Sequence, residues 1–307
     1  MLFHRRTDGR DSIRCLPLNL SVPLLNLPKN PRVLLIRRDN IGDLVLTTPA
    51  LTLLRERFPE AHIAALVNSY NAPVLEGNSA VDQIFIYTKV KHAGLGVLRA
   101  ALGKLRTLLR VRAQRFDLAI VATAAPSRSW MQLARQCGAR SILAAAPPDS
   151  PVPRGVDICV RVDERFAGRH GVEHNVLLFE PLGVTGPPPA LKVVANPSGV
   201  ARVQEILNSR LGSAPTIGLH VSARKPPQRW PQERFIELAH QLHKLLGARF
   251  LLLWSPGAHD DPRHPGDDDK ADAIAKACID LPLVALSTLS LRQLIDGLAC
   301  IDLMFCS

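Results

Sequence analysis

Some features are scarce in this sequence. Aromatic residues make up only 5% of the chain, and they are not interleaved with basic residues as in a stacking surface for single-stranded nucleic acid. No apolar run approaches the roughly 18 residues that a transmembrane helix needs. The sequence therefore argues against a nucleic-acid partner and contains no transmembrane segment.

Paired cysteines are also missing. None of the six cysteines forms a CxxC pair, and none clusters with histidines. This usage predicts reduced, mostly buried thiols in a cytosolic protein and no metal site. The cysteines are Cys15, Cys137, Cys159, Cys278, Cys300 and Cys306.

The glycine-rich phosphate loops of common nucleotide-binding proteins are absent as well. Neither a GxGxxG fingerprint nor a Walker A loop follows the first predicted strand. This absence argues against a nicotinamide-dependent dehydrogenase. It also gives no indication that the first turn holds a phosphate group.

The composition indicates a folded protein that favours anionic partners. The chain has 307 residues, of which 47% are hydrophobic and 21% charged, as in globular proteins with room for two domains. The formal net charge is +11. A positive field of this size favours anionic partners, which include nucleotide diphosphates, phosphorylated glycolipids, acidic membranes and nucleic acid, and it does not choose among them.

Apolar runs alternate with helical patterns from residue 31 onward, which predicts an α/β fold with parallel sheets. The predicted strands are Arg32 to Arg37, Ala61 to Val67, Gln83 to Tyr87, Asp117 to Ala122, Thr216 to His220, Arg249 to Trp254, Leu281 to Leu286 and Ile301 to Phe305. The predicted helices cover Gly42 to Arg57, Leu95 to Arg112, Ser127 to Gln136, Pro231 to Leu246, Asp268 to Cys278 and Leu291 to Leu298.

The rhythm restarts once, so we expect two Rossmann-like domains. Residues 1–30 are predicted to be a flexible N-terminal extension, and residues 31–185 the first domain. Prolines concentrate after residue 185, so residues 186–214 are predicted to be an interdomain linker region. Residues 215–307 are predicted to be a partial second domain. Ligands of such sheets bind beyond the carboxyl ends of the strands.

The first turn, Arg37 to Pro49, directly follows a predicted strand. Gly42 is expected to permit a tight bend and the close approach of a ligand. Asp43 follows it at the start of a helix, where it is either an N-cap or a functional carboxylate. Asp39 is expected to form a structural salt bridge with Arg37 or Arg38.

The second turn follows His220 and carries three cations, Arg224, Lys225 and Arg229. Cations and helix N-terminal amides can stabilise a diphosphate leaving group, which favours a phosphate-binding loop over a merely solvated one. Pro231 is expected to be the first helical residue. Trp230 is predicted to be a core or interdomain residue.

The third turn is Ser255-Pro256-Gly257, followed by a polar loop that ends in three aspartates. The irregular spacing of its histidines and aspartates argues against a metal site. We predict that Asp267 or Asp268 caps the next helix.

The opening motif R-x-D-x-I-G-D-x-x-L-T-T-P-A-L, which begins at Arg37, resembles that of glycosyltransferase family 9, the ADP-heptose:lipopolysaccharide heptosyltransferases. Further similarities are Glu56-Arg57-Phe58-Pro59, Val81-Asp82, and His170 with Asn175, which fit the family's interdomain helix. The resemblance runs from about Pro31 to the final residue.

The resemblance implies a GT-B fold, in which two Rossmann-like domains face a cleft. The first domain would bind a phosphorylated glycolipid or similar glycan acceptor, and the second the ADP-sugar, with no further cofactor. Transfer would invert the anomeric centre without a metal. Asp43 would be the general base, with Asn40 and Gly42 in the acceptor-side loop.

The resemblance also implies donor-site residues. Ser222 fits the hydroxyl position of the family's H-x-x-x…K-R-W-P motif, whereas Gln228 stands at its lysine position, so Lys225 or Arg229 would supply the charge. Gly257 would border the nucleotide pocket.

In the family the last strand leads into a D-x-G-x-x-H-x-A-A motif, which does not follow Ser307. We therefore expect an incomplete second domain and impaired transfer. The alternative function is a non-catalytic nucleotide-binding remnant of the same fold. For the basic helix Leu95 to Arg112, a solvated face is favoured over contact with phosphorylated lipid at the inner membrane.

Overall fold

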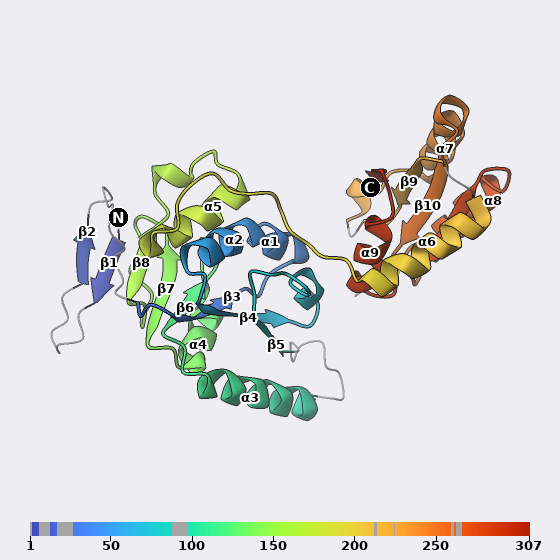
Figure 1. Cartoon of the computed structure of the whole chain (residues 1–307). Helices are drawn as coiled ribbons and strands as arrows, with labels where there is room; N and C mark the ends of the chain where they lie inside the picture. Colours follow the sequence, from blue (N-terminus) through green and yellow to red (C-terminus); the bar gives the residue numbers. More distant parts are fainter. Residues whose placement is uncertain are drawn as a thin grey trace. The chain divides into compact units, whose positions relative to one another are not determined.

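The computed structural model describes residues 2–5, 13–16, 27–87, 97–211, 214–223, 225–258, 261 and 266–307. The chain divides into two compact units, Met1–Val193 (unit 1) and Val194–Ser307 (unit 2). Each unit is built on its own sheet (Figure 1). Most of residues 1–30, predicted to be an extension, lie outside the described residues.

The described part of unit 1 contains a mainly parallel sheet in the order β2-β1-β8-β7-β6-β3-β4-β5. Strands β3 to β8 run parallel, and β1 and β2 continue the sheet antiparallel beyond β8. The strands are β1 (Leu2–Arg5), β2 (Ile13–Leu16), β3 (Arg32–Ile36), β4 (His62–Asn68), β5 (Gln83–Tyr87), β6 (Leu118–Val121), β7 (Ser141–Ala146) and β8 (Ile158–Arg161).

Helices lie on both faces of this sheet (Figure 1). Alternate residues of β3 pack on opposite faces, because side chains of a strand point alternately to its two sides; Leu34 and Ile36 join the core with Val111 of α3 and Met131 of α4. The helices are α1 (Ile41–Val45), α2 (Thr48–Arg57), α3 (Val97–Ala113), α4 (Arg128–Cys137) and α5 (Gly171–Phe179), with 3₁₀ turns η1 (Ala72–Val74), η4 (Glu164–Phe166) and η5 (Glu180–Leu182).

The predicted helix from Gly42 to Arg57 is divided in two. Helix α1 ends at Val45, and α2 begins at Thr48. Pro49 explains the break, because its ring has no N–H to donate and would clash with the carbonyl of Val45 in a continuous helix. The division places Asp43 in a short helix of its own.

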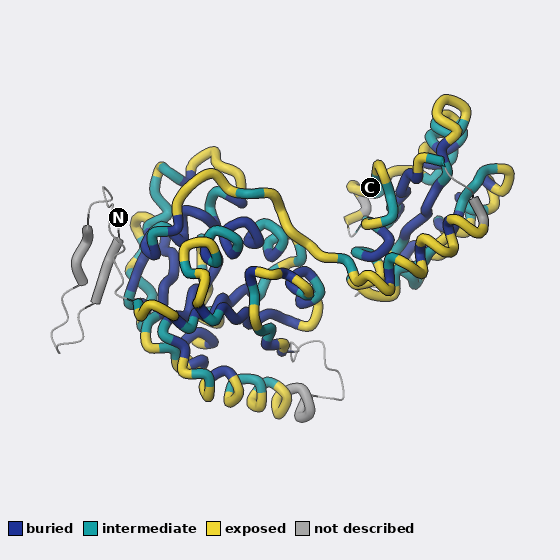
Figure 2. Tube along the Cα trace, in the orientation of Figure 1, coloured by how far each residue is buried: buried dark blue, intermediate teal, exposed yellow. Residues whose placement is uncertain are grey.

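The described part of unit 2 contains a parallel sheet in the order β11-β10-β9-β12. On β10, Phe250 and Leu252 join one core, whereas Leu251 and Leu253 join the core on the other face. Figure 2 shows the buried strands β9 and β10 inside a more exposed outer layer, whereas the edge strand β12 is partly exposed. The elements are α6 (Pro197–Leu211), β9 (Thr216–His220), η6 (Pro226–Gln228), α7 (Gln232–Leu246), β10 (Arg249–Trp254), α8 (Asp268–Ala277), β11 (Leu283–Ser287), α9 (Leu291–Leu298) and β12 (Leu303–Cys306).

Most of the predicted linker region, residues 186–214, is helical. Helix α6 occupies Pro197–Leu211 and packs on α9. Gly199 permits this contact, since a Cβ atom there would overlap the Asp296 carboxylate. Pro197, one of the prolines that suggested a linker, is therefore the first residue of α6, and Gly199 is a packing position.

Candidate functional site

The first predicted turn lies where the strand order of unit 1 reverses. From β3 the chain proceeds to β4 and β5 on one side, and then to β6, β7 and β8 on the other. Such a reversal leaves a crevice beyond the carboxyl ends of the two central strands. Residues that follow β3 and residues that follow β6 line a pocket of about 220 Å³ there.

A buried arginine organises this pocket. The Arg37 side chain is only 8% exposed; its Nε lies 2.8 Å from Asp39 Oδ1, and its Nη2 lies 3.6 Å from Asp43 Oδ1. Nη1 donates to the carbonyl of Ala122, at the end of β6. The predicted salt bridge of Asp39 is thus confirmed, with Arg37 as the partner.

Burial shifts the pKa values of both Arg37 and Asp39. The pKa of Arg37 lies below its ordinary value because burial disfavours the cation, although Asp39 and Asp43 oppose the shift. The pKa of Asp39 is raised by burial, and the Arg37 charge opposes that shift. Desolvation of this kind is typical of an ion pair enclosed by the fold.

Asp43 occupies the third position of α1 and is not its N-cap. The N-cap is Asn40, whose backbone N–H donates to Asp43 Oδ2 at 3.2 Å. The Asn40 side-chain amide donates to the same oxygen at 3.3 Å. With Arg37 at its other oxygen, the carboxylate is held at both ends while its side chain stays 37% exposed.

Gly42 does not provide the predicted tight bend. It lies inside α1 and is not among the glycines with a positive φ. A Cβ atom at this position would meet nothing within 4 Å. Gly42 therefore leaves the surface beside Asp43 open without bending the chain.

Helix α5 contributes residues whose place in the pocket the sequence analysis missed. Asn175 is 5% exposed; its Oδ1 accepts from Arg37 Nη1 at 3.3 Å, and its Nδ2 donates to the Leu46 carbonyl at 3.0 Å. His174 Nε2 lies 2.7 Å from the carbonyl oxygen of Phe166. The complete lining is Arg37, Asp39, Asp43, Leu46, Thr123, Ala124, Ala145, Phe166, Gly171, His174, Asn175 and Leu178.

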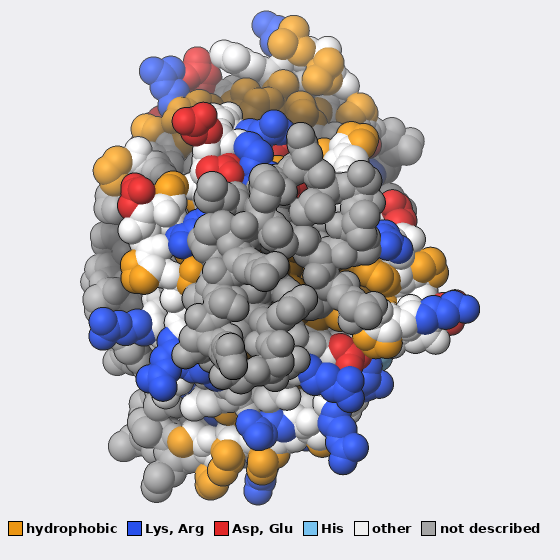
Figure 3. Space-filling view, turned by 90° about the vertical axis from the view of Figure 1, so that its left-hand side faces the viewer, with side chains coloured by type: hydrophobic (Ala, Val, Ile, Leu, Met, Phe, Trp, Pro, Cys, Tyr) orange, Lys and Arg blue, Asp and Glu red, His pale blue; other side chains and the backbone are white. Residues whose placement is uncertain are grey.

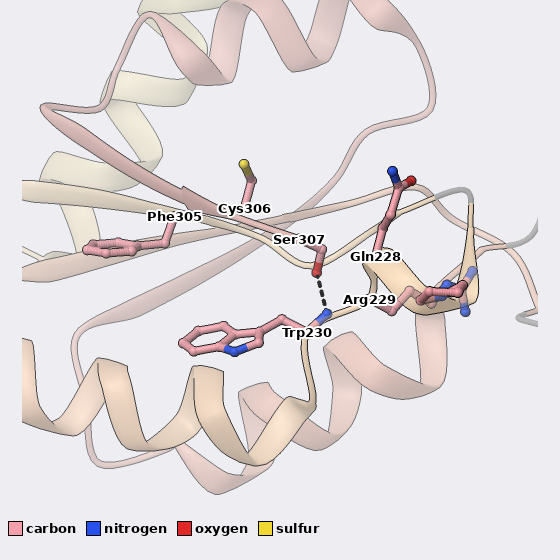
Figure 4. Close-up of a pocket in the computed structure, with 7 residues that line it drawn as sticks. Gln228, Arg229, Trp230, Phe305, Cys306 and Ser307 are labelled. Carbon is pink, nitrogen blue, oxygen red and sulfur yellow. Dashed lines mark hydrogen bonds between the residues drawn. The ribbon is translucent and has the colours of Figure 1, made fainter.

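Unit 2 has a pocket at the corresponding place in its own sheet. Strands β9 and β12 are neighbours, and the strand order reverses between them. A pocket of about 370 Å³ lies beyond their carboxyl ends. Figure 4 shows the Trp230 and Phe305 side chains at this pocket, and the backbone N–H of Trp230 donates to Ser307 Oγ at 3.2 Å.

Trp230 is only partly a core residue. Its ring packs edge-to-face on Phe235 with 4.8 Å between centroids, yet the residue is 38% exposed. It also lines a second pocket, of about 460 Å³, together with Asp267, Asp269 and Lys270. Pro231, expected to be the first helical residue, is the N-cap of α7.

The hydroxyl of Ser222 links two turns of unit 2. Ser222 Oγ accepts from the backbone N–H of Ser255 at 2.9 Å. In the third turn, Gly257 has a φ of +121°, and its N–H donates to Asp268 Oδ2 at 2.9 Å. Ser222 and Gly257 thus lie on adjacent turns that follow neighbouring strands.

Arg229 is committed to the protein itself. Its Nη1 lies 3.3 Å from Asp267 Oδ1, on a carboxylate that is 2% exposed, and its Nε donates to the Ala223 carbonyl at 2.9 Å. Asp267 holds the N-cap position of α8 without a side-chain cap bond. Figure 4 shows Arg229 extending away from the Trp230 and Phe305 rings.

Lys225 is exposed on the same loop, and no described residue forms an ion pair with it. Arg224, the other predicted cation, lies outside the described residues. Lys225 is therefore better placed than Arg229 to meet an added anion.

Two further findings concern metals and thiols. Among the described residues, no group of three or more His, Cys, Asp and Glu side chains is arranged to hold a metal ion. Cys137, Cys278, Cys300 and Cys306 are free thiols, and Cys137, Cys159 and Cys278 are buried. Burial raises the pKa of Cys137 to about 12, as expected for an unreactive core thiol.

Several solved structures resemble this fold. The glycosyltransferase family 9 protein of Veillonella parvula superposes with a TM-score of 0.72 and 20% identity, covering 91% of this chain and 76% of that one. For Escherichia coli ADP-heptose lps heptosyltransferase II the TM-score is 0.67, with 18% identity and coverage of 90% and 78%. For Escherichia coli heptosyltransferase WaaC with ADP the TM-score is 0.65 and the identity 18%, and the match covers 90% of this chain and 80% of that one.

The sequence comparisons agree with the structural ones. Lipopolysaccharide heptosyltransferase 3 of Escherichia coli strain K12 is 24% identical over 253 residues, which are 80% of this chain and 67% of the relative. The sequence model of glycosyltransferase family 9 (heptosyltransferase) matches residues 105–307. The fold is GT-B, and the chain belongs to glycosyltransferase family 9, the heptosyltransferase family.

Proposed function

We propose that this chain transfers a heptose or related sugar from an ADP-sugar to a lipopolysaccharide core or similar phosphorylated glycan, with inversion and without a metal ion. The observation that best supports this proposal is the position of the Asp43 carboxylate. It lies at the switch-point pocket of unit 1, fixed by Asn40 and Arg37 and still 37% exposed. We also propose a cytoplasmic site of action, which the free thiols of Cys137 and Cys278 support.

Asp43 is the proposed general base. It takes the proton from an acceptor hydroxyl while that oxygen forms a bond to the anomeric carbon. The bond from the anomeric carbon to the diphosphate oxygen breaks, and ADP leaves with the electron pair. Base assistance of this kind contributes about 10²–10⁴-fold in rate. Gly42 keeps the neighbouring surface open for the acceptor.

The loop residues of unit 2 are the proposed donor site. Ser222 Oγ accepts a backbone N–H, which leaves its own O–H able to donate to a phosphate oxygen. Lys225 supplies positive charge for the departing diphosphate, because Arg229 is already paired with Asp267. The Gly257 turn, which is held by Asp268, lies at the carboxyl ends of the strands of unit 2, as Ser222 does.

The test is a transfer assay with ADP-heptose and a lipid A–Kdo acceptor, following ADP release and product mass. Asp43→Asn is expected to lower kcat at least about 10²-fold and to leave ADP-heptose affinity unchanged. Glu56→Gln, an exposed carboxylate of α2, is the matched control and should retain full activity.

Full turnover by Asp43→Asn would exclude Asp43 as the base. No turnover by the unmodified chain, combined with measurable ADP binding, would favour the non-catalytic nucleotide-binding alternative.

A further inference from the structure

The outer surface of α3 is unlike that of the other helices of unit 1. The helix (Val97–Ala113) packs on β5 and α4 at one end of the sheet (Figure 1). Its inner face is anchored by Val111, which is fully buried, and by Leu108, which packs on the same core. Thr107 Oγ1 donates to the Ile86 carbonyl at 3.0 Å.

Three leucines of α3 point away from this core. Leu102, Leu105 and Leu109 are 55%, 52% and 57% exposed. Their spacing of three and four residues places them in one stripe along the helix. A helix face that meets only water normally carries polar residues there. A continuous stripe of half-exposed leucines therefore indicates a surface that another partner covers.

Cations flank the leucine stripe. Arg106 and Arg110 are exposed and lie one turn apart, next to Leu102 and Leu109 on the helix surface. In Figure 3, hydrophobic and basic side chains lie beside one another at the lower end of the molecule, where α3 lies in Figure 1. The helix contains Arg99, Lys104, Arg106, Arg110 and Arg112 and no acidic residue.

We propose that the outer face of α3 docks on the surface of an anionic lipid bilayer. The leucines would enter the boundary between headgroups and acyl chains, and the arginines would meet lipid phosphates. A basic helix with an apolar stripe is the known form of such interfacial contacts. None of the helices that the structure describes is both long and apolar enough to span a membrane.

The composition of α3 favours lipid over other occupants. A second copy of the chain would bring two cationic faces together, and like charges across an interface oppose association. Protein interfaces are enriched in aromatic anchors, and nucleic-acid surfaces in stacking rings, but α3 has no aromatic residue. Leucine with arginine and no acid matches an anionic bilayer.

The test is vesicle flotation of the full chain without substrates, so that its outcome does not depend on the proposed transfer reaction. Vesicles of phosphatidylcholine alone are compared with vesicles that also contain phosphatidylglycerol. The chain is expected to float with the anionic vesicles only. Leu105→Gln with Leu109→Gln, and separately Arg106→Gln with Arg110→Gln, should each lower the bound fraction at least about tenfold.

Matched controls come from unit 2. Leu245→Gln with Leu246→Gln removes two leucines that are 76% and 57% exposed. Arg202→Gln with Lys244→Gln removes two exposed cations and changes the net charge equally. Both controls should bind as the unmodified chain does, and thermal unfolding should be the same for all variants.

Three results would overturn the proposal. The first is no flotation of the unmodified chain, and the second is equal losses in the α3 variants and the controls. The third is an α3 leucine variant that changes sedimentation behaviour but not vesicle binding, which would make α3 an interface between copies.

Discussion

His220 has a local environment with a consequence for stability. Burial lowers its pKa from the ordinary 6.5, opposed by Asp267 and by a hydrogen bond with the Ser222 backbone. Between pH 6.5 and the lower pKa of the folded unit, His220 binds a proton in the unfolded chain but not in the folded unit. The stability contribution is therefore fully present above pH 6.5 and is lost as the pH falls toward the folded pKa.

We accordingly expect urea unfolding of unit 2 to shift to lower urea as the pH falls below 6.5. The shift should be smaller in His220→Gln. Fluorescence of Trp230 and Trp254 reports on unit 2 once Trp130 of unit 1 is replaced by phenylalanine. An identical pH dependence in both proteins would show that His220 does not contribute.

Three elements, α5, α1 and β3, are joined at Asn175. Its side chain joins α5 to the end of α1 through the Leu46 carbonyl, and to β3 through Arg37. Asn175→Leu keeps the volume but leaves buried polar groups without partners, which costs about 1–3 kcal/mol each. Because α1 carries Asp43, we also expect kcat to fall.

Asn78→Leu is the control for this prediction, since Asn78 is another buried asparagine of unit 1, 3% exposed, and does not line the pocket. Both variants should unfold at lower temperature, but only Asn175→Leu should lower the kcat of the folded protein. Equal kcat values would assign Asn175 to stability alone.

The regular elements could be predicted where pattern and length agree. Strands β5, β9 and β10 have the predicted bounds, because each is a short apolar run between polar turns. Strands β7 and β8 were missed. Strand β7 reads Ser-Ile-Leu-Ala-Ala-Ala, and alanine has low strand propensity, so only its burial in the sheet explains it.

Part of each site could also be predicted. The turn with Asp43 could be predicted because it comes directly after a strand, and the ion pair of Arg37 with Asp39 could be predicted because the two residues are close in sequence. Asn175 contacts Arg37 across 138 positions, and Phe305 and Trp230 line the same pocket only because of the strand order. Arg229 was one of the two cations expected to bind phosphate. Its ion pair with Asp267 could not be predicted, because it depends on where the fold places the start of α8.

At the scale of the whole molecule, charge is the main feature. The net charge of +11 creates a field that attracts anionic ligands, which would include the phosphorylated acceptor proposed above. The Debye length falls from about 30 Å at 0.01 M salt to about 8 Å at 0.15 M. We therefore expect kcat/KM for a phosphorylated acceptor to fall over this range while kcat stays constant.

A dephosphorylated acceptor is the control, and its kcat/KM should vary much less. If both acceptors gave the same salt dependence, the field of the protein would not be guiding the acceptor.

In the pocket of unit 1, the segment that holds Asp43 differs from the segments that form the remaining walls. The Asp43 carboxylate is held by β3 and α1, whereas Thr123, Phe166 and His174 enter the pocket from segments after β6 and before or within α5. Loops at such positions can change length and sequence without moving the scaffold. The pocket walls proposed to contact the acceptor can therefore change in evolution while Asp43, the group proposed to activate it, stays in place.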